Sequence, residues 1–356
     1  KAAGMIARER ILPMPVHRSF ALIVLVALSL VSGCTPLTFT VNVTGGEQKL
    51  TETVVQEDTY AGSRKIAMVD MSGLIMNGPK PGLLSQGENP VALFAEQLKK
   101  AAEDEDVKGV ILRVNSPGGT VTATDIMYRE LVRFKEMTKK PVVVLMMDLA
   151  ASGGYYLSCG GDHIIAYPST ITGSIGVYIQ TISLKPAMDK LGIEAEALKS
   201  GKNKTAGSLF GKLTDDHRAV LQALVDDFYA RFRGIVKETR PKIPAERFDD
   251  LTDGRVVSGE DALEAGLVDQ IGDLHDAFAK VKEMSHLKAA RLVLYHRPVD
   301  YVATPYAQAS GKGSGTGMGL EAANAGMQIN LIQINLGGMS NESTIGFYYL
   351  WQPTLP

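Results

Sequence analysis

Cysteine and histidine are scarce in this chain of 356 residues. Its two cysteines, Cys34 and Cys159, lie far apart in the sequence, and the six histidines form no cluster with them. Metal sites built from these residues need several ligands at short, regular spacings. We therefore expect no metal site, and the chemistry argued below needs no cofactor. If Cys34 is modified, as its surroundings indicate, Cys159 has no partner and no disulfide is expected.

An excess of positive charge is also missing. The formal net charge is −2 and the pI is near 6.4. Proteins that bind nucleic acid usually carry a strongly basic face, so nucleic acid is not an expected partner.

The apolar run at residues 20–31 is shorter than the roughly twenty residues of a spanning helix. A hydrophobic content of 45% is ample for a packed core, either in two domains or in one large domain with tails.

The first 34 residues have the pattern of a targeting segment. Three arginines precede the apolar run, and Ser-Gly-Cys follows it at 32–34. This order is typical of a bacterial signal peptide, and small residues before a cysteine resemble a lipobox that makes Cys34 the lipidated first residue. An uncleaved membrane anchor is the alternative, and we favour the lipoprotein. Either way we expect export to the bacterial cell envelope, with residues 35–64 as a tether containing one edge strand.

Strand and helix patterns alternate through residues 65–297. Short apolar runs predict buried strands, and apolar residues recurring every three or four positions predict helices. Such alternation predicts an α/β domain around a largely parallel sheet. Strands are expected at 66–70, 110–114, 141–147 and 292–295, and helices at 90–102, 120–134, 213–240, 259–265 and 273–284.

Ser152 stands in the sequence Ala-Ser-Gly-Gly-Tyr-Tyr at 151–156, directly after a predicted buried strand. This order predicts a strand, a tight turn and a helix, with Ser152 at the helix N-terminus. The first backbone N–H groups of a helix have no internal partner and favour negative charge. Two glycines let a substrate carbonyl approach the backbone. Ser152 is therefore a candidate nucleophile, and the alternative is an ordinary N-cap.

A Pro-Gly-Gly turn at 117–119 follows the preceding predicted strand. The carboxyl edge of an open α/β sheet is where such folds bind their ligands. One N–H group from Gly118 or Gly119 and one from Gly153 would form an oxyanion hole, in which each donor is worth roughly 3 kcal/mol. The alternative is a purely structural turn.

A serine hydroxyl needs a neighbouring base to become a nucleophile. The histidines are badly placed for this, whereas Lys199, Lys202 and Lys204 lie in an expected loop after a strand-like segment at 193–198. A lysine acts as a base when burial lowers its pKa. Spacing alone does not choose among the three lysines, and a solvated basic loop is the alternative.

The order of motifs resembles the signal peptide peptidase A family, which are serine-lysine proteases of the Clp/crotonase-like fold. The resemblance covers residues 65–297 and implies repeated ββα/βαβ units with a largely parallel buried sheet and surrounding helices. The motifs are Asn-Ser-Pro-Gly-Gly at 115–119, Ala-Ser-Gly-Gly-Tyr-Tyr at 151–156, Thr-Gly-Ser-Ile-Gly-Val at 172–177, Ser-Gly-Lys-Asn-Lys at 200–204, the stretch at 253–262 and Gly-Leu-Val-Asp at 266–269.

The resemblance also assigns roles to individual residues. It implies that Ser152 is the nucleophile and Lys204 the general base. Gly119 and Gly153 are the implied oxyanion donors, with Gly118 supporting them. Ser174 matches a position whose hydroxyl helps to orient the lysine. Family members usually carry an aromatic residue or histidine before the lysine and an acidic residue after it, whereas this chain has asparagine at 203 and threonine at 205.

The function implied is that of a membrane-associated serine endopeptidase. Its substrates would be apolar peptides such as released signal peptides, cut within a ring-shaped homo-oligomer. One alternative is a crotonase-like acyl-CoA enzyme, which would need neither the serine nor the lysine. A second is a non-catalytic lipoprotein that keeps the scaffold for interaction.

Residues 298–356 differ in composition from the domain before them. A Gly/Ser-rich stretch at 309–317 is typical of a flexible linker. Apolar islands follow at 329–332 and 347–351. They are expected to dock on a neighbouring subunit or meet a membrane, and the alternative is a partly disordered tail.

Overall fold

The computed structural model describes residues 49–79, 87–298, 302–307 and 346–351. The expected signal peptide with Cys34, the linker at 309–317 and the apolar island at 329–332 lie outside these residues. Within the described part of the chain, no helix has both the length and the apolar character needed to cross a membrane.

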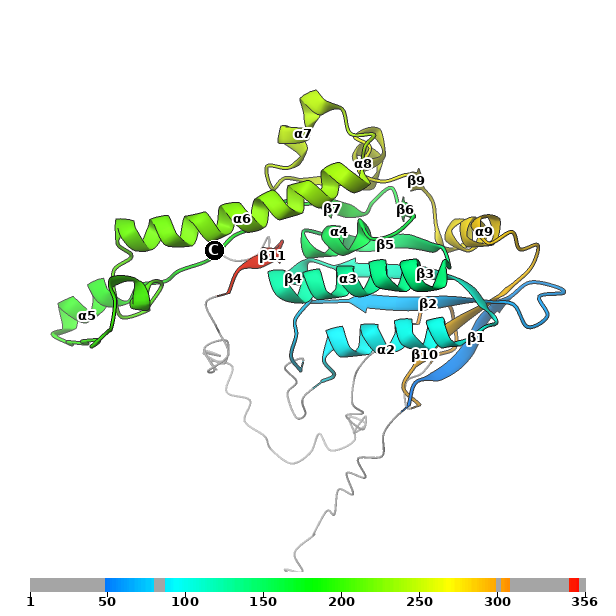
Figure 1. The fold of residues 1–356 in the computed structure, drawn as a ribbon, viewed down its shortest axis with the longest axis horizontal. Coiled ribbons are helices and arrows are strands. Elements are labelled where there is room, and N and C mark those ends of the chain that lie inside the picture. Colours follow the sequence, from blue (N-terminus) through cyan, green and yellow to red (C-terminus); the bar gives the residue numbers. More distant parts are fainter. Residues whose placement is uncertain (1–48, 80–86, 299–301, 308–345, 352–356) are drawn as a thin grey trace, which may run out of the picture. The chain divides into compact units, whose positions relative to one another are not determined.

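A nine-stranded sheet organises the described residues (Figure 1). Its main order is β1-β10-β2-β3-β5-β6-β9, and β7 pairs with the end of β5 and with β8. All pairings are parallel except β1 with β10 and β7 with β8. The strands are β1 (Thr51–Glu57), β2 (Lys65–Ser72), β3 (Val107–Ser116), β5 (Val142–Ala151), β6 (His163–Ala166), β7 (Ile171–Gly173), β8 (Val256–Ser258), β9 (Gln270–Ile271) and β10 (Arg291–His296). The predicted α/β fold with a largely parallel sheet is confirmed.

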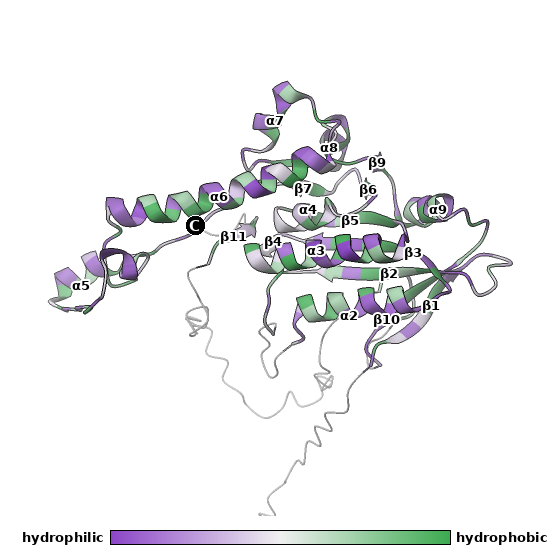
Figure 2. Ribbon diagram, in the orientation of Figure 1, coloured by the Kyte–Doolittle hydropathy of each residue, from purple (hydrophilic) through white to green (hydrophobic). Residues whose placement is uncertain are grey.

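Helices cover both faces of this sheet, so its strands are apolar on both sides (Figure 2). Neighbouring side chains of a strand point to opposite faces. Accordingly Ala67 and Val69 pack with α2, α3 and α4, whereas Ile66 and Met68 pack with α9. These helices are α2 (Pro90–Glu103), α3 (Val121–Thr138), α4 (Gly153–Ser158) and α9 (Leu274–Met284).

Most helices begin where the sequence predicts. Asn89 accepts hydrogen bonds from the first turn of α2, and Asp273 forms a capping box with Asp276 at the start of α9. Thr214 accepts a hydrogen bond from the His217 amide and begins the longest helix. The remaining helices are α5 (Lys185–Leu191), the 3₁₀ turn η1 (Lys202–Thr205), α6 (Asp215–Thr239), α7 (Ala245–Leu251) and α8 (Gly259–Glu264).

Two segments outside the expected core add strands. The expected tether contributes β1, which pairs antiparallel with β10 at the edge of the sheet. The end of the chain contributes β11 (Tyr348–Leu350), which pairs antiparallel with β4 (Gly118–Thr120) in a separate two-stranded sheet. The second of these places the tail beside the Pro-Gly-Gly turn.

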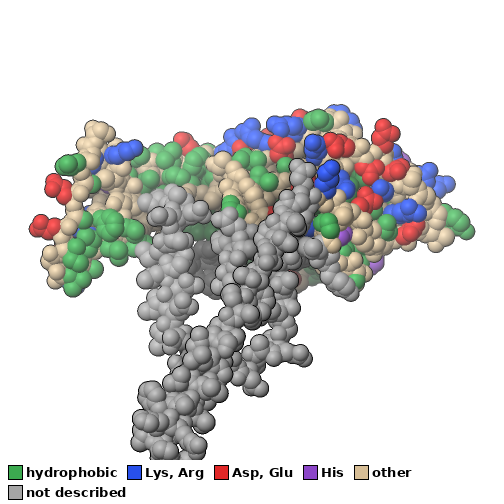
Figure 3. All heavy atoms as spheres, turned by 90° about the horizontal axis from the view of Figure 1, so that it is seen from below, with side chains coloured by type: hydrophobic (Ala, Val, Ile, Leu, Met, Phe, Trp, Pro, Cys, Tyr) green, Lys and Arg blue, Asp and Glu red, His purple; other side chains and the backbone are tan. Residues whose placement is uncertain are grey.

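Residues 182–224, which we call the arm, extend from the sheet and comprise α5, η1 and the first part of α6 (Figure 1). The prediction of a strand at 193–198 is wrong, because this segment has no neighbouring strand with which to pair and takes no regular structure. Hydrophobic side chains gather over the arm (Figure 3). Its exposed apolar residues are Ile182, Leu184, Leu191, Ile193, Leu198, Phe210, Val220 and Leu224.

Candidate active site

Ser152 lies at the turn between β5 and α4, as the sequence predicts. Its backbone has φ 53° and ψ −114°, a combination that is strained for any residue with a side chain. Hydrogen bonds hold it there, because its amide donates to the Gly173 carbonyl at 2.8 Å and its carbonyl accepts from the Tyr156 amide at 2.8 Å. Ser152 occupies the N-cap position of α4, as the alternative interpretation expects, but its side chain makes no capping hydrogen bond. A strained backbone without a capping role is typical of a functional serine.

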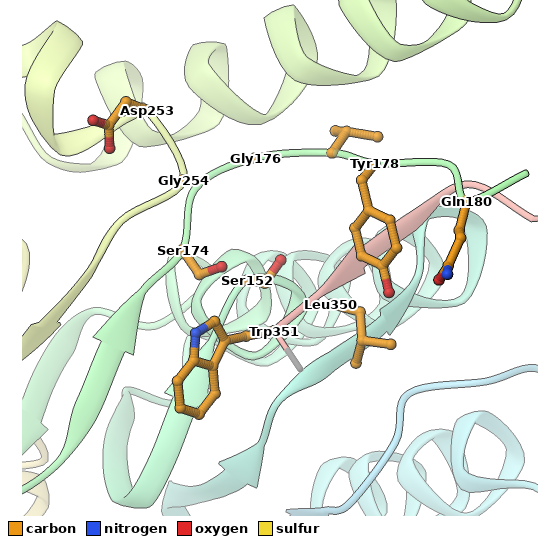
Figure 4. A pocket seen from close by; sticks show the side chains of 10 residues that line it. Ser152, Ser174, Gly176, Tyr178, Gln180, Asp253, Gly254, Leu350 and Trp351 are labelled. Carbon is orange, nitrogen blue, oxygen red and sulfur yellow. The ribbon is translucent and has the colours of Figure 1, made fainter. Parts of the chain in front are cut away.

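Ser152 and Ser174 line the same cavity of about 450 Å³ (Figure 4). Its wall continues along Gly176, Val177 and Tyr178 on one side. Ser174 also has a positive φ, 50°, and its amide donates to the Arg255 carbonyl at 2.7 Å. Both serines are almost fully buried, and the cavity that they line is large enough for part of a peptide.

The Pro-Gly-Gly turn gives Gly118 and Gly119 different environments. The Gly118 amide donates to the Ser116 hydroxyl at 3.1 Å, and the Gly118 carbonyl accepts from the Ile75 amide at 2.8 Å. Since Thr120 also bonds to Ile75, the backbone groups of Gly119 face the opposite side, toward β11. Of the two glycines, Gly119 is therefore the one whose backbone N–H faces β11.

Gly118 and Gly153 approach one another closely. A Cβ on Gly118 would lie 2.6 Å from the Gly153 nitrogen, and a Cβ on Gly119 would lie 1.8 Å from the Ile75 carbonyl oxygen. Gly118 has φ +103°, which side chains rarely adopt. The structure thus brings Gly118, Gly119 and Gly153 together with Ser152, and each glycine is needed for close backbone contact.

Lys204 does not join this group within one chain. It lies in η1 on the arm, is exposed, and is not among the residues that line the Ser152 cavity. Of the other two lysines, Lys202 forms an ion pair with Asp216, and Lys199 donates to Thr205. No hydrogen bond connects Ser152 with any of the three lysines, all of which the structure describes.

A polar cluster behind Ser152 was missed by sequence reasoning. The Asp125 carboxylate accepts hydrogen bonds from the Tyr156 hydroxyl at 2.7 Å and from the Arg231 guanidinium at 2.7 Å. Burial alone would raise the pKa of Asp125, but hydrogen bonds from Arg129, Tyr156 and Arg231 outweigh burial and leave that pKa below its ordinary value. Asp125 and Arg231 belong to α3 and α6, which are far apart in the sequence, so no local pattern could reveal the cluster.

No group of three or more histidine, cysteine, aspartate or glutamate side chains suited to a metal ion occurs among the residues that the structure describes. The site itself offers the Ser152 hydroxyl and the backbone of the neighbouring glycines. A buried serine at a strand-to-helix turn, close to the glycine backbone at the carboxyl edge of a parallel sheet, is suited to acyl transfer.

This fold and this turn are those of a Clp-like serine protease, and the comparisons with known proteins agree. Residues 135–288 match Peptidase family S49, and residues 85–173 match Clp protease. The chain is 36% identical over 250 residues to a putative signal peptide peptidase SppA of Enterococcus faecium, covering 70% of this chain and 72% of the relative. It is 35% identical over 236 residues to a putative protease of Methanocaldococcus jannaschii, covering 66% of this chain and 75% of the relative.

The match to longer relatives is partial. The chain is 36% identical over 231 residues to Protease 4 of Salmonella typhi, covering 65% of this chain but only 36% of that protein. The chain belongs to peptidase family S49, and it is a serine protease.

Proposed function

We propose that this chain is an endopeptidase in which Ser152 attacks the peptide carbonyl, Lys204 accepts the hydroxyl proton, and Gly119 and Gly153 donate hydrogen bonds to the oxyanion. The observation that carries the proposal is the strained, buried Ser152 beside the backbone of Gly118 and Gly153. Acyl transfer needs a nucleophile and donors in this arrangement.

In this proposal Lys204 reaches the Ser152 of a neighbouring copy. Lys204 lies on the arm, outside the cavity of its own chain. The arm also carries exposed apolar side chains, whose contact with water is unfavourable. Packing of arms against neighbouring copies would bury these side chains and desolvate the amine, which is what a lysine base requires. A ring-shaped homo-oligomer, with Ser174 orienting the lysine, is the assembly we expect.

The substrates proposed are apolar peptides, such as cleaved signal peptides. The Enterococcus faecium relative is named a putative signal peptide peptidase, and Val177, Tyr178 and Leu350 are among the residues that line the Ser152 cavity. We also propose that the protein is tethered to a membrane of the bacterial cell envelope through residues 1–34, either by lipid on Cys34 or by an uncleaved anchor. The arginine-rich start and the apolar run support this location. Residues 65–297 would then be the protease domain, and residues 298–356 a linker and tail.

A complementation experiment tests the dyad. Peptide hydrolysis is measured for wild type, Ser152→Ala, Lys204→Ala and the matched control Lys202→Ala. We expect the first two variants to lose nearly all activity, the control to keep it, and the wild-type rate to rise with alkalinity.

The two inactive variants are then unfolded, mixed and refolded together. Recovery of part of the activity supports a dyad between copies, and no recovery contradicts it. Full activity of either single variant would remove the dyad altogether. Labelling by a fluorophosphonate separates a protease from a scaffold, since a scaffold would leave Ser152 unlabelled.

A further inference from the structure

His217 is a buried histidine on the otherwise exposed start of α6. This helix has 25 residues, and its buried ones are His217, Phe232 and Val236. Phe232 and Val236 belong to the main core, whereas His217 lies in the first turn of the helix, on the arm. His217 is 6% exposed, while its neighbours Asp216 and Arg218 are exposed. A polar ring enclosed in this way is expected to have a hydrogen-bond partner.

That partner is the turn that carries Lys204. The Nε2 atom of His217 lies 2.8 Å from the Lys202 carbonyl oxygen in η1. Because a carbonyl only accepts, Nε2 carries the proton and donates it. Nδ1 is buried and has no hydrogen-bond partner among the residues that the structure describes. A proton on Nδ1 would find no acceptor, so the ring fits this place in the tautomer with its proton on Nε2.

A second contact between η1 and α6 is weaker. The Lys202 ammonium pairs with the Asp216 carboxylate at 2.8 Å, but their side chains are 73% and 62% exposed. Ion pairs so open to solvent contribute little, because water and salt screen them. The hydrogen bond from His217 is enclosed, and a buried donor that loses its acceptor is costly. Of the two contacts, the imidazole is therefore the one that holds η1 against α6.

The base of the loop that contains η1 is closed by the backbone. The Leu184 amide donates to the Leu209 carbonyl at 2.7 Å and joins the two ends of the loop. The loop between them contains α5 and η1. Lys204 lies in η1, two residues after the carbonyl that His217 holds. With its base closed and η1 bonded to α6, the loop presents Lys204 from a fixed place on the arm.

We propose that His217 is a positioning residue for the proposed base: its imidazole holds η1 against α6 and so sets the place from which the Lys204 amine reaches Ser152 of a neighbouring copy. This inference rests on the function proposed above. His217 is not among the residues that line the Ser152 cavity, so it acts through Lys204. A base must lie within hydrogen-bond reach of the proton that it takes. A displacement of about 1 Å can lower the rate about a hundred-fold.

Three variants of the full-length protein test this role by hydrolysis of fluorescein-labelled casein. His217→Leu removes the donor, and we expect kcat to fall about 10- to 100-fold with KM unchanged. His217→Gln keeps a side-chain N–H donor and should restore most of that loss. The matched control Arg218→Leu makes the same replacement at an exposed neighbour and should keep its activity. Full activity of His217→Leu, or equal losses in the leucine and glutamine variants of His217, would overturn the inference.

Mixed assemblies distinguish positioning of the base from a general effect on the arm. In a refolded mixture of Ser152→Ala and Lys204→Ala chains, the first supplies the base and the second supplies the nucleophile. His217→Leu is then added to one chain or to the other. The recovered activity should be at least about ten-fold lower when the change is in the chain that supplies Lys204. Equal activity of the two mixtures would show that His217 serves the packing of the arm, and would overturn the inference.

Failure of this inference differs from failure of the proposed function. If wild type does not cut casein, or if Lys204→Ala is as active as wild type, the proposed function is wrong and this inference falls with it. If Lys204→Ala is inactive while His217→Leu is fully active, only the positioning role is removed. Lys202→Ala loses the exposed ion pair but keeps the carbonyl that His217 holds, so it should retain the activity that His217→Leu loses.

Discussion

The Ser152 amide donates a hydrogen bond of 2.8 Å to the Gly173 carbonyl, which ties the turn after β5 to the end of β7. Because Gly173 directly precedes Ser174, this bond also fixes the distance between the two serines of the cavity. The turn is therefore held in place from outside its own sequence, and a strained backbone can persist there.

Replacing Ser152 separates strain from chemistry. Ser152→Ala and Ser152→Gly should both be inactive, but only glycine adopts φ 53° without strain. We expect the unfolding free energy of Ser152→Gly, measured by urea denaturation, to be about 1 kcal/mol higher than that of Ser152→Ala. Equal or lower stability of the glycine variant would show that the turn is not strained.

Acid should weaken the fold through Asp269. Burial alone would raise the pKa of Asp269, but the hydrogen bond and charge of Arg240 outweigh it and hold that pKa below its ordinary 3.8. The folded carboxylate then binds fewer protons than the unfolded one, so its contribution is complete above pH 3.8 and is lost as pH falls through the folded pKa.

Unfolding in urea at pH 7 and pH 3 measures this contribution. Asp269→Asn should lower the unfolding free energy by about 3 kcal/mol at pH 7, since it leaves the Arg240 charge without its carboxylate partner. Between pH 7 and pH 3 the unfolding free energy of this variant should fall less than that of wild type. The control Asp249→Asn, in an exposed pair with Arg233, should change little. An equal acid response in wild type and Asp269→Asn would contradict this assignment.

Arg113 should be costly to remove alone. It forms a buried ion pair with Asp70 and donates hydrogen bonds to the carbonyls of Pro305 and Ala307. Arg113→Leu leaves a buried carboxylate and should lower the unfolding free energy by about 3 to 5 kcal/mol. The double variant with Asp70→Leu should be more stable than Arg113→Leu, and a further loss in the double variant would contradict this explanation.

Cys159 should be inert in the folded protein. Burial raises the pKa of its thiol to about 11, and its side chain is almost fully enclosed. In a Cys34→Ser chain at pH 8, we expect Ellman's reagent to detect no thiol until the protein is denatured, and then one. Rapid reaction of the native variant would contradict the observed packing.

The core and the serine turn could be predicted because their signals are local. Apolar runs marked β2, β3 and β5, and the sequence around Ser152 contained its strand, turn and helix within a few residues. The strand predicted at 193–198 failed for the opposite reason, because an apolar segment becomes a strand only when a neighbour can pair with it.

The surroundings of Ser152 could not be predicted, because they are assembled from distant segments. The pocket around Tyr349 is formed by Tyr156 of α4 and by Phe228 and Phe232 of α6, and Tyr349 itself comes from β11. Sequence reasoning assigned the long apolar face of α6 to core or subunit contact without separating the two. In the structure Phe232 and Val236 are buried, whereas Val220 and Leu224 on the arm are exposed.

β11 lies between β4 and Tyr178, with backbone hydrogen bonds to both, and this groove has a consequence for neighbouring proteins. The hydrogen bonds along those edges use backbone N–H and carbonyl groups of the bound segment, and in a natively folded protein these groups are already satisfied by its own helices and sheets. The groove would thus select substrates first by their backbone conformation and only then by their side chains. Mature proteins would be spared, and only chains that have lost or never acquired structure would enter.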